Sequence, residues 1–149
     1  MARTTDFLMN FRRIIKLHES MLKEICETYQ LTFIEANIIS FLHNNPGRDT
    51  ARDIVELRML SKGNVSQAVE SLIQKGLLMR TPDQEDRRII HLALLEQAVP
   101  ITQTMERQKS LFQEEIFTGF TDSEKELYHQ LNTRIMENTK SAMKRRETT

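Results

Sequence analysis

The most constraining feature of this sequence of 149 residues is the order of the short segments between residues 50 and 95. The first of them, TARDIVEL, begins with Thr50 and Asp53 at the spacing of a capping box, which predicts the start of a short helix. Its apolar spacing predicts that Ile54 and Leu57 face inward. A linker of only three residues, RML, leads to the next segment, so the two segments must lie close together.

A second helix and a β-hairpin are predicted directly after this linker. Ser61 is a favourable N-cap residue, apolar residues then recur at three- and four-residue steps, and Gly76 is suited to end the helix. Two short strand-like segments follow, on either side of the polar loop DQEDR. Two short helices joined by a tight turn form a helix-turn-helix unit, expected at 50–75, and the hairpin at 77–95 is then the wing of a winged helix.

The rest of the chain is predicted to be helical. A long amphipathic helix is expected at 5–28, and two more long helices are expected within 97–146, because apolar residues recur there at helical steps. Two further pairs of residues have capping-box spacing: Thr32 with Glu35, and Thr121 with Glu124. The predicted fold class is mainly α with a small β-hairpin wing, in a single domain, 1–149, whose winged helix-turn-helix lobe, 32–95, is flanked by the long helices.

The composition favours a cytoplasmic protein and argues against an enzyme. The formal net charge is zero, so the chain as a whole is not attracted to nucleic acid or membranes, and any attraction to DNA must come from a local patch. The single cysteine excludes an intrachain disulfide, and no apolar run suits a signal peptide or a membrane span. We find no nucleophile–base pair, phosphate-binding glycine loop or cluster of metal ligands, so we expect no catalysis, no cofactor and no metal.

The stretch SKGNVSQ opens the second helix of the unit with weak helix formers and small polar side chains. In a helix-turn-helix, the first residues of this helix face base edges in the major groove, and its free N–H groups suit phosphate. Glycine permits close backbone approach, asparagine and glutamine match adenine, and lysine can reach guanine or phosphate. The predicted DNA contacts of this helix are Ser61, Lys62, Gly63, Asn64, Ser66 and Gln67. The alternative is a solvated helix start with an indifferent glycine.

The tip of the hairpin, PDQEDRR, supplies the second group of candidates. Arginine suits the minor groove or a phosphate because its planar fork is partly pre-organised. We expect Arg87 and Arg88 to contact DNA, with Asp86 bracing an arginine, while Arg52 and Arg80 are weaker candidates for phosphate contact. The alternative here is a polar turn whose charges cancel.

From Asp53 to Arg88, the sequence DIVELRMLSKGNVSQAVESLIQKGLLMRTPDQEDRR resembles the winged-helix core of the MarR (multiple antibiotic resistance regulator) family. The matching parts are the helix-turn-helix, the KGLL.R lead into the first wing strand, and the D.R pattern of Asp86 and Arg88. The long flanking helices agree with the family's layout, so the resemblance covers nearly the whole chain. One departure follows the second wing strand, where LALLEQAVP replaces the family's LT..G and the next helix loses its threonine cap.

The resemblance implies a homodimer, built from the helices at 5–28 and 97–146, that binds double-stranded DNA. Independently, three long amphipathic helices carry more apolar surface than one domain of this size needs for itself. A two-fold dimer would read a pseudo-palindrome with half-sites about 10 bp apart. Family members commonly repress transcription and release DNA when a small phenolic or lipophilic compound binds between the dimer helices and the DNA-binding lobe, so such an effector is expected here.

Two alternatives stay open at this point. The first is a winged helix that binds protein instead of DNA, which the zero net charge permits. The second is a zinc- or oxidant-sensing regulator of the same fold. Oxidant sensing needs an exposed thiolate of low pKa, but Cys26 lies late in the first helix with no cationic neighbour in sequence. The histidines show no paired metal-ligand spacing: His18, His43, His91 and His129.

Overall fold

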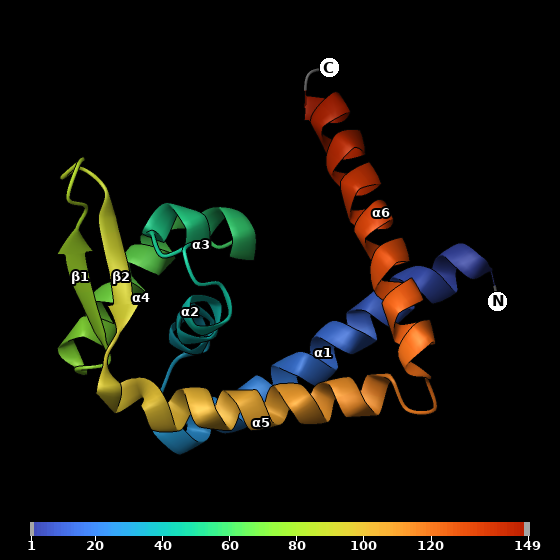
Figure 1. Cartoon of the computed structure of the whole chain (residues 1–149), viewed down its shortest axis with the longest axis horizontal. Helices are drawn as coiled ribbons and strands as arrows, with labels where there is room; N and C mark the ends of the chain where they lie inside the picture. Colours follow the sequence, from blue (N-terminus) through green and yellow to red (C-terminus); the bar gives the residue numbers. More distant parts are fainter. Residues whose placement is uncertain (1, 148–149) are drawn as a thin grey trace. The chain divides into compact units, whose positions relative to one another are not determined.

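The structure is a computed structural model that describes residues 2–147 (Figure 1). These residues form six α-helices, one short 3-10 helix and two strands. In chain order these elements are α1 (Arg3–Tyr29), α2 (Phe33–Asn44), α3 (Ala51–Arg58), α4 (Lys62–Gln74), β1 (Leu78–Pro82), β2 (Ile90–Leu94), η1 (Glu96–Ala98), α5 (Val99–Ile116) and α6 (Asp122–Glu147). The predicted fold class, mainly α with a small hairpin, is confirmed. No helix of the described part is long and apolar enough to cross a membrane.

Contacts divide the chain into two compact units, one ending at Phe112 and the other beginning at Gln113. The core of the first unit is centred on α2, whose Ile38 and Ile39 are fully buried. Around α2 the core is completed by α4, the hairpin and parts of α1 and α5: Leu22, Ile25, Val65, Leu72, Leu78, Leu92, Ile101 and Met105. Burial of this apolar surface is the main force that holds the winged lobe together.

The predicted capping interactions are all formed. Thr32 and Glu35 make a reciprocal capping box at the start of α2, and Thr50 and Asp53 make one at the start of α3. At the start of α4 the Ser61 hydroxyl accepts a hydrogen bond from the backbone N–H of Asn64, at 3.2 Å. These local bonds fix where each helix of the helix-turn-helix begins.

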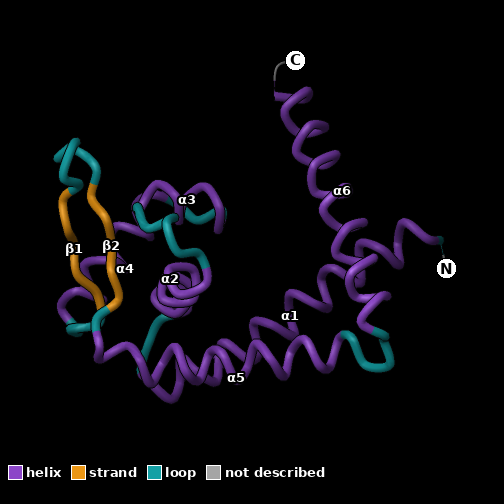
Figure 2. The backbone as a smooth tube through the Cα atoms, viewed as in Figure 1, coloured by secondary structure: helices purple, strands orange, loops and turns teal. Residues whose placement is uncertain are grey.

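The hairpin after α4 is a two-stranded antiparallel sheet, drawn in orange in Figure 2. Leu78 pairs with Leu94 at its base, and Pro82 pairs with Ile90 next to the tip. Leu78 and Leu92 are buried against the core, whereas the tip beyond Pro82 extends away from it. The hairpin is therefore anchored at one end and free at the other, as a wing must be.

One inward position of α3 was predicted wrongly. Ile54 is fully buried, but the Leu57 side chain is 55 % exposed. Instead of Leu57, Arg58 turns toward the lobe, and its guanidinium carbon lies 5.6 Å from the centre of the Phe41 ring. Because α3 has only eight residues and ends in the left-handed Met59, its last turn lies at the edge of the core, where the long stem of arginine reaches further than leucine.

The second wing strand leads into α5 without a side-chain cap. Residues Glu96–Ala98 form a single 3-10 turn, and the residue before it, Leu95, makes no side-chain cap bond. Pro100 is the second residue of α5, a position that tolerates proline because the N–H it lacks has no helical partner there. The missing threonine cap therefore changes the start of α5 and leaves the fold intact.

The second unit consists of the end of α5 and the whole of α6. Thr121 and Glu124 form the predicted capping interaction at the start of α6, with bonds of 2.8 and 3.1 Å. Phe117 packs against the Tyr128 ring with 5.5 Å between ring centres. No described residue of α6 is buried, so its stripe of apolar side chains is uncovered: Leu127, Leu131, Ile135 and Met143.

Candidate nucleic-acid interface

The first two turns of α4 have a buried face and an exposed face. Val65, Ala68 and Val69 are buried in the lobe. The predicted contact residues all lie on the exposed face: Ser61, Lys62, Gly63, Asn64, Ser66 and Gln67. The sequence produces this division because the apolar residues recur at helical steps and the small polar ones fill the positions between them.

The exposed side chains of these turns are not engaged within the chain. Those of Lys62, Asn64, Ser66 and Gln67 make no hydrogen bond or ion pair to any residue from 2 to 147. The first turn also contains no acidic residue, so the positive end of the helix dipole is not neutralised by its own sequence. Free donors and an uncompensated dipole suit a polyanion.

Gly63 is not required by the fold. A Cβ atom built on it would have no atom within 4 Å, and the residue lies in an ordinary helical conformation. An alanine would fit there and would favour the helix by about 0.5–1 kcal/mol. Packing within the chain therefore does not explain the glycine at this position.

The wing tip holds one of its two arginines in a fixed geometry. Arg88 donates from Nε and Nη2 to the two carboxylate oxygens of Asp86, both at 3.1 Å, although its side chain is 90 % exposed. The bond from Arg88 lowers the pKa of Asp86 below its ordinary value, so the brace is charged at neutral pH. Arg87 is exposed and makes no ion pair within residues 2–147. The predicted brace thus holds Arg88.

The two weaker candidates already have acidic partners. Arg80 of β1 pairs with Glu70 on α4, and Arg52 pairs with Glu56 one turn further along α3, at 3.1 Å. Either arginine would have to exchange this partner for a phosphate. Contact of Arg52 or Arg80 with DNA stays a prediction.

A cluster at the base of the wing tip did not emerge from the sequence. His91 of β2 lies between Asp49, in the loop before α3, and Asp83, the first residue after β1. The ring nitrogens are 2.6 and 2.8 Å from the respective carboxylate oxygens. No spacing rule connects positions 42 residues apart, so only the fold could bring Asp49 and His91 together. The described residues contain no group of three acids, histidines or cysteines that could hold a metal.

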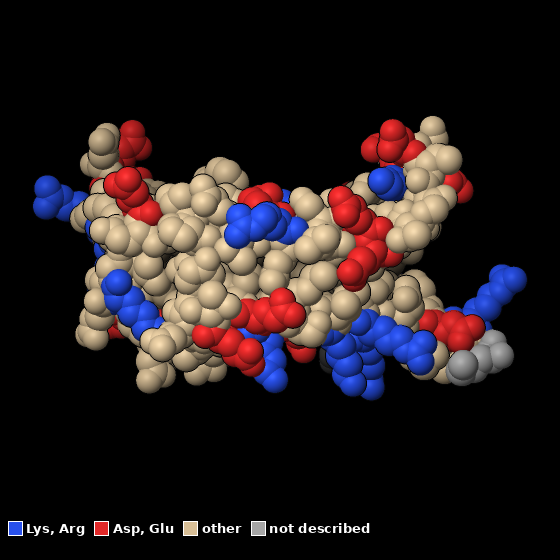
Figure 3. Space-filling model, turned by 90° about the horizontal axis from the view of Figure 1, so that it is seen from below, with Lys and Arg blue, Asp and Glu red and all other residues tan. Residues whose placement is uncertain are grey.

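The net charge of zero gives the chain as a whole no attraction to DNA. On the face drawn in Figure 3, basic and acidic side chains are interspersed, as expected from a net charge of zero. Local features of α4 and the wing must therefore provide any attraction to a phosphate backbone.

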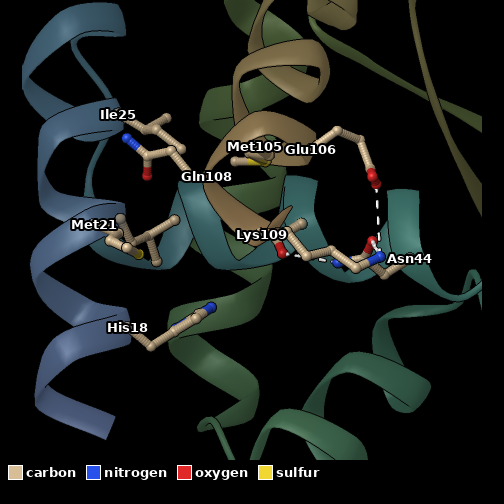
Figure 4. A pocket seen from close by; sticks show the side chains of 10 residues that line it. His18, Met21, Ile25, Asn44, Met105, Glu106, Gln108 and Lys109 are labelled. Atoms are coloured by element: carbon tan, nitrogen blue, oxygen red, sulfur yellow. Dashed lines mark hydrogen bonds and ion pairs between the residues drawn. The ribbon is translucent and has the colours of Figure 1, made fainter. Parts of the chain in front are cut away.

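Two hollows of the lobe differ in size and position. The one in Figure 4 is small, about 60 Å³, and side chains of α1, α2 and α5 converge on it, with Lys109 Nζ 3.4 Å from the Asn44 amide oxygen. A larger groove of about 450 Å³ lies between α3, α4 and the wing, where Val55, Val69 and Ile90 provide apolar walls and Lys62 lies at the edge. Only the second volume falls within the roughly 300–1,000 Å³ of typical ligand sites.

The lone thiol does not have the properties of an oxidant sensor. Cys26 is half-buried and its Sγ lies 3.7 Å from the backbone oxygen of Thr32. Burial raises the pKa of this thiol, which disfavours the reactive thiolate.

Comparison with known proteins gives this arrangement a context. A model of the MarR family matches residues 29–89, which include α2 to α4 and the wing tip. No curated protein matches the sequence. Solved structures that share the fold are numerous, and three of them illustrate the likeness.

The chain is similar to a MarR transcriptional regulator from Methanosarcina mazei Go1, with 19 % identity and a TM-score of 0.71 over 91 % of this chain and 98 % of that one. It is similar to S. aureus MepR in a complex with DNA, with 15 % identity and a TM-score of 0.67 over 93 % and 98 %. It is also similar to Bordetella bronchiseptica BpsR, whose DNA binding is regulated by 6-hydroxynicotinic acid, with 18 % identity and a TM-score of 0.65 over 88 % and 98 %. At these identities the likeness shows a shared fold.

Proposed function

We propose that this chain, whose residues 29–89 match a model of the MarR family, is a sequence-specific DNA-binding transcriptional regulator. In this proposal a homodimer represses transcription by binding a pseudo-palindromic operator, and it has no catalytic activity. The observation that carries the proposal is the exposed first turn of α4, whose polar side chains are unengaged, next to a wing that presents a braced Arg88. These are the two elements with which a winged helix contacts a duplex.

Each exposed residue has a chemical role in this proposal. Asn64 and Gln67 offer paired donor and acceptor groups to adenine, and Lys62 reaches guanine or a phosphate. The N–H groups of the first turn bind a phosphate. Arg88 enters the minor groove or binds its edge, where the brace from Asp86 reduces the side-chain entropy lost on binding.

The uncovered apolar surface of the long helices supports a homodimer. On α1, Phe7, Phe11 and Ile15 are exposed, and α6 carries its own exposed apolar stripe. Contiguous exposed apolar surface of this kind marks an interaction site. A second copy of the chain would cover these faces and give the two-fold symmetry that a pseudo-palindrome requires.

Release by a small effector is the last part of the proposal. The DNA binding of BpsR, a relative in fold, is regulated by 6-hydroxynicotinic acid. In this chain the groove between α3, α4 and the wing is lined by apolar side chains and reaches Lys62 and Ser66. A small lipophilic or phenolic molecule bound there would compete with DNA for the surface of α4.

Selection from random duplex DNA tests the proposal, with purified wild type, Arg88→Ala and Arg107→Ala compared. Arg107 is an exposed arginine on α5 that donates to the Thr104 hydroxyl, so its removal deletes the same charge away from the wing. We expect the wild type and Arg107→Ala to enrich a pseudo-palindrome. Arg88→Ala should bind it more weakly, with the slope of log affinity against log salt reduced by about 1.

Two outcomes would count against the proposal. Equal salt slopes for the three proteins would remove the wing from the contact surface. No enrichment at low salt, with the oligomer shown to be intact, would refute DNA binding and favour a winged helix that binds protein.

A further inference from the structure

The geometry around His91 requires a charged ring. Its Nδ1 lies 2.6 Å from Asp49 Oδ1, and its Nε2 lies 2.8 Å from Asp83 Oδ1. Ionised carboxylates only accept hydrogen bonds, so both ring nitrogens must donate for both bonds to form. A neutral imidazole carries one N–H, and only the imidazolium carries two.

The other groups around the ring do not oppose this charge. The hollow beside His91 is lined by Thr81, Pro82, Asp83, Gln84 and Glu85. Its charged members are both acidic, and Asp49 completes the set from the loop before α3. No lysine or arginine forms an ion pair with Asp49 or Asp83 in the described part of the chain. The hydrogen bonds to Asp49 and then to Asp83 raise the pKa of His91 above its ordinary 6.5.

The cluster is linked directly to the wing tip. The second oxygen of Asp83, Oδ2, accepts hydrogen bonds from the backbone N–H groups of Glu85 and Asp86, at 3.1 and 3.0 Å. The Asp86 carboxylate in turn holds Arg88. A continuous series of bonds therefore runs from the loop before α3, through His91, to the arginine that faces outward.

The base of the wing has a second attachment that does not depend on pH. The backbone N–H of Leu92 donates to the backbone oxygen of Asp49, at 2.8 Å. The strand β2 therefore stays on the lobe when His91 loses its proton, and only the tip beyond it loses a restraint.

We propose that protonated His91 is a positioning residue for DNA binding: by bridging Asp49 and Asp83, it fixes the wing tip that carries Arg88. This inference rests on the proposed function. The bridge is complete at mildly acidic pH, where the imidazolium persists and the carboxylates of Asp49 and Asp83 are still ionised. It loses one bond as the pH rises through the raised pKa of His91. DNA affinity then falls because a looser tip loses more entropy when it docks.

Binding of the selected operator, followed by fluorescence anisotropy at constant ionic strength, tests this inference. Between about pH 6 and about pH 8.5 the wild type should lose affinity by about fivefold, the size expected for a partly exposed ion pair. His91→Gln should bind with the weaker affinity at every pH. His91→Arg keeps a permanent charge and a fork that can meet two carboxylates, so it should retain the tighter affinity and lose the pH dependence.

A matched control separates this effect from a general effect of histidine protonation. His43 also faces a carboxylate, with Nε2 2.9 Å from Glu106 Oε1, but it lies on α2. His43→Gln should keep the wild-type pH profile. A His91→Gln variant that keeps that profile as well would overturn the inference.

NMR of the protein without DNA distinguishes this inference from the proposed function. We expect the backbone amides of Glu85 and Asp86 to shift with the same midpoint as the His91 ring in the wild type, and not in His91→Gln. Amides that do not follow the ring overturn the positioning role. A wild type that binds no DNA at any pH refutes the proposed function, and with it the effect of His91 on DNA.

Discussion

The helix α4 and the wing are each attached to the rest of the lobe by a contact between a basic and an acidic side chain, but the two attachments differ in burial. On the α4 side, Glu35 of α2 is 1 % exposed and accepts hydrogen bonds from Ser71 Oγ at 2.9 Å and Lys75 Nζ at 3.0 Å. On the wing side, the His91 side chain is 36 % exposed between its two carboxylates. The carboxylate of the α4 attachment is shielded from water, although Lys75 is 38 % exposed, whereas all three side chains of the wing attachment are partly exposed.

This difference predicts that α4 and the wing tip are held in place with different firmness. A buried carboxylate is tolerated only when its hydrogen bonds are satisfied, and Glu35 also accepts one from the backbone N–H of Thr32 at 2.8 Å. Breaking any of these bonds leaves a desolvated charge, so α4 is held in one position. Water can replace a partner of His91 at a lower cost than it can replace a partner of Glu35, so the wing tip is held less firmly than α4.

The two attachments also respond to pH with opposite sign. Burial alone would raise the pKa of Glu35, but hydrogen bonds from the Thr32 backbone, Lys75 and Ser71 outweigh it and lower that pKa below the ordinary 4.5. A lowered carboxylate pKa gives stability that is present above 4.5 and is lost as the pH falls through the lowered value. The raised pKa of His91 gives a contribution that is present below 6.5 and is lost as the pH rises.

Removing Glu35 should have the largest effect. Glu35→Ala leaves Ser71 without its acceptor, leaves Lys75 with only the backbone oxygen of Gln30, and breaks the capping box of α2. We expect the free energy of unfolding to fall by about 2–3 kcal/mol, less than the roughly 3–5 kcal/mol for a fully buried broken pair, because Lys75 is partly exposed. Urea unfolding followed by circular dichroism measures this loss.

Glu106→Ala is the matched control for this experiment. Glu106 also pairs with a basic side chain, His43, but about half of its own side chain is exposed. Its removal should change stability by less than about 0.5 kcal/mol. Similar losses of stability in the two variants would contradict the idea that the buried carboxylate of Glu35 matters more than an exposed one such as Glu106.

A pH series sharpens the same comparison with smaller changes. Thermal unfolding of the wild type should show a loss of stability in acid, and Glu35→Gln should reduce the acid-side slope because the amide has no proton to gain there. His91→Gln should remove the decline in stability that the raised pKa of His91 causes above 6.5. It should also remove the part of the acid-side slope that comes from Asp83, because the hydrogen bond from His91 is the main cause of the lowered pKa of Asp83. An acid-side slope unaffected by Glu35→Gln would show that other carboxylates govern it.

The sequence predicted those features that depend on neighbours along the chain. Ser61 as a cap, the capping boxes and the wing were all predictable, because caps and periodicity act over three or four residues. The burial of Leu57 was predicted wrongly, since the position of a short helix at the edge of the core is set by the whole lobe. The order of the elements followed from the same local patterns, and the family resemblance agreed with it.

The two attachments were not predictable because they join distant positions. Glu35 and Lys75 are 40 residues apart, and Asp49 and His91 are 42 residues apart. Glu35 was assigned to a capping box, which it forms, but its spacing gives no sign of its bonds to α4. The pairing of Arg80 with Glu70 likewise joins two elements, β1 and α4. Predicting such contacts requires the fold first.

The smallest change tests whether α4 is as fixed as its attachment implies. Gly63→Ala adds one methyl group where no atom of the chain lies within 4 Å, so the fold should gain about 0.5–1 kcal/mol of stability from the better helix former. If DNA packs against the backbone here, the methyl group meets it, and a helix held by Glu35 cannot move away. Stability measured by urea unfolding should therefore rise while operator affinity falls.

Ser66→Ala, also on the exposed face, is the control for loss of a contact without added bulk. The Gly63→Ala protein could instead be more stable and bind DNA as tightly as the wild type. That outcome would mean either that α4 can shift to accommodate the methyl group, or that its backbone does not pack closely against the duplex.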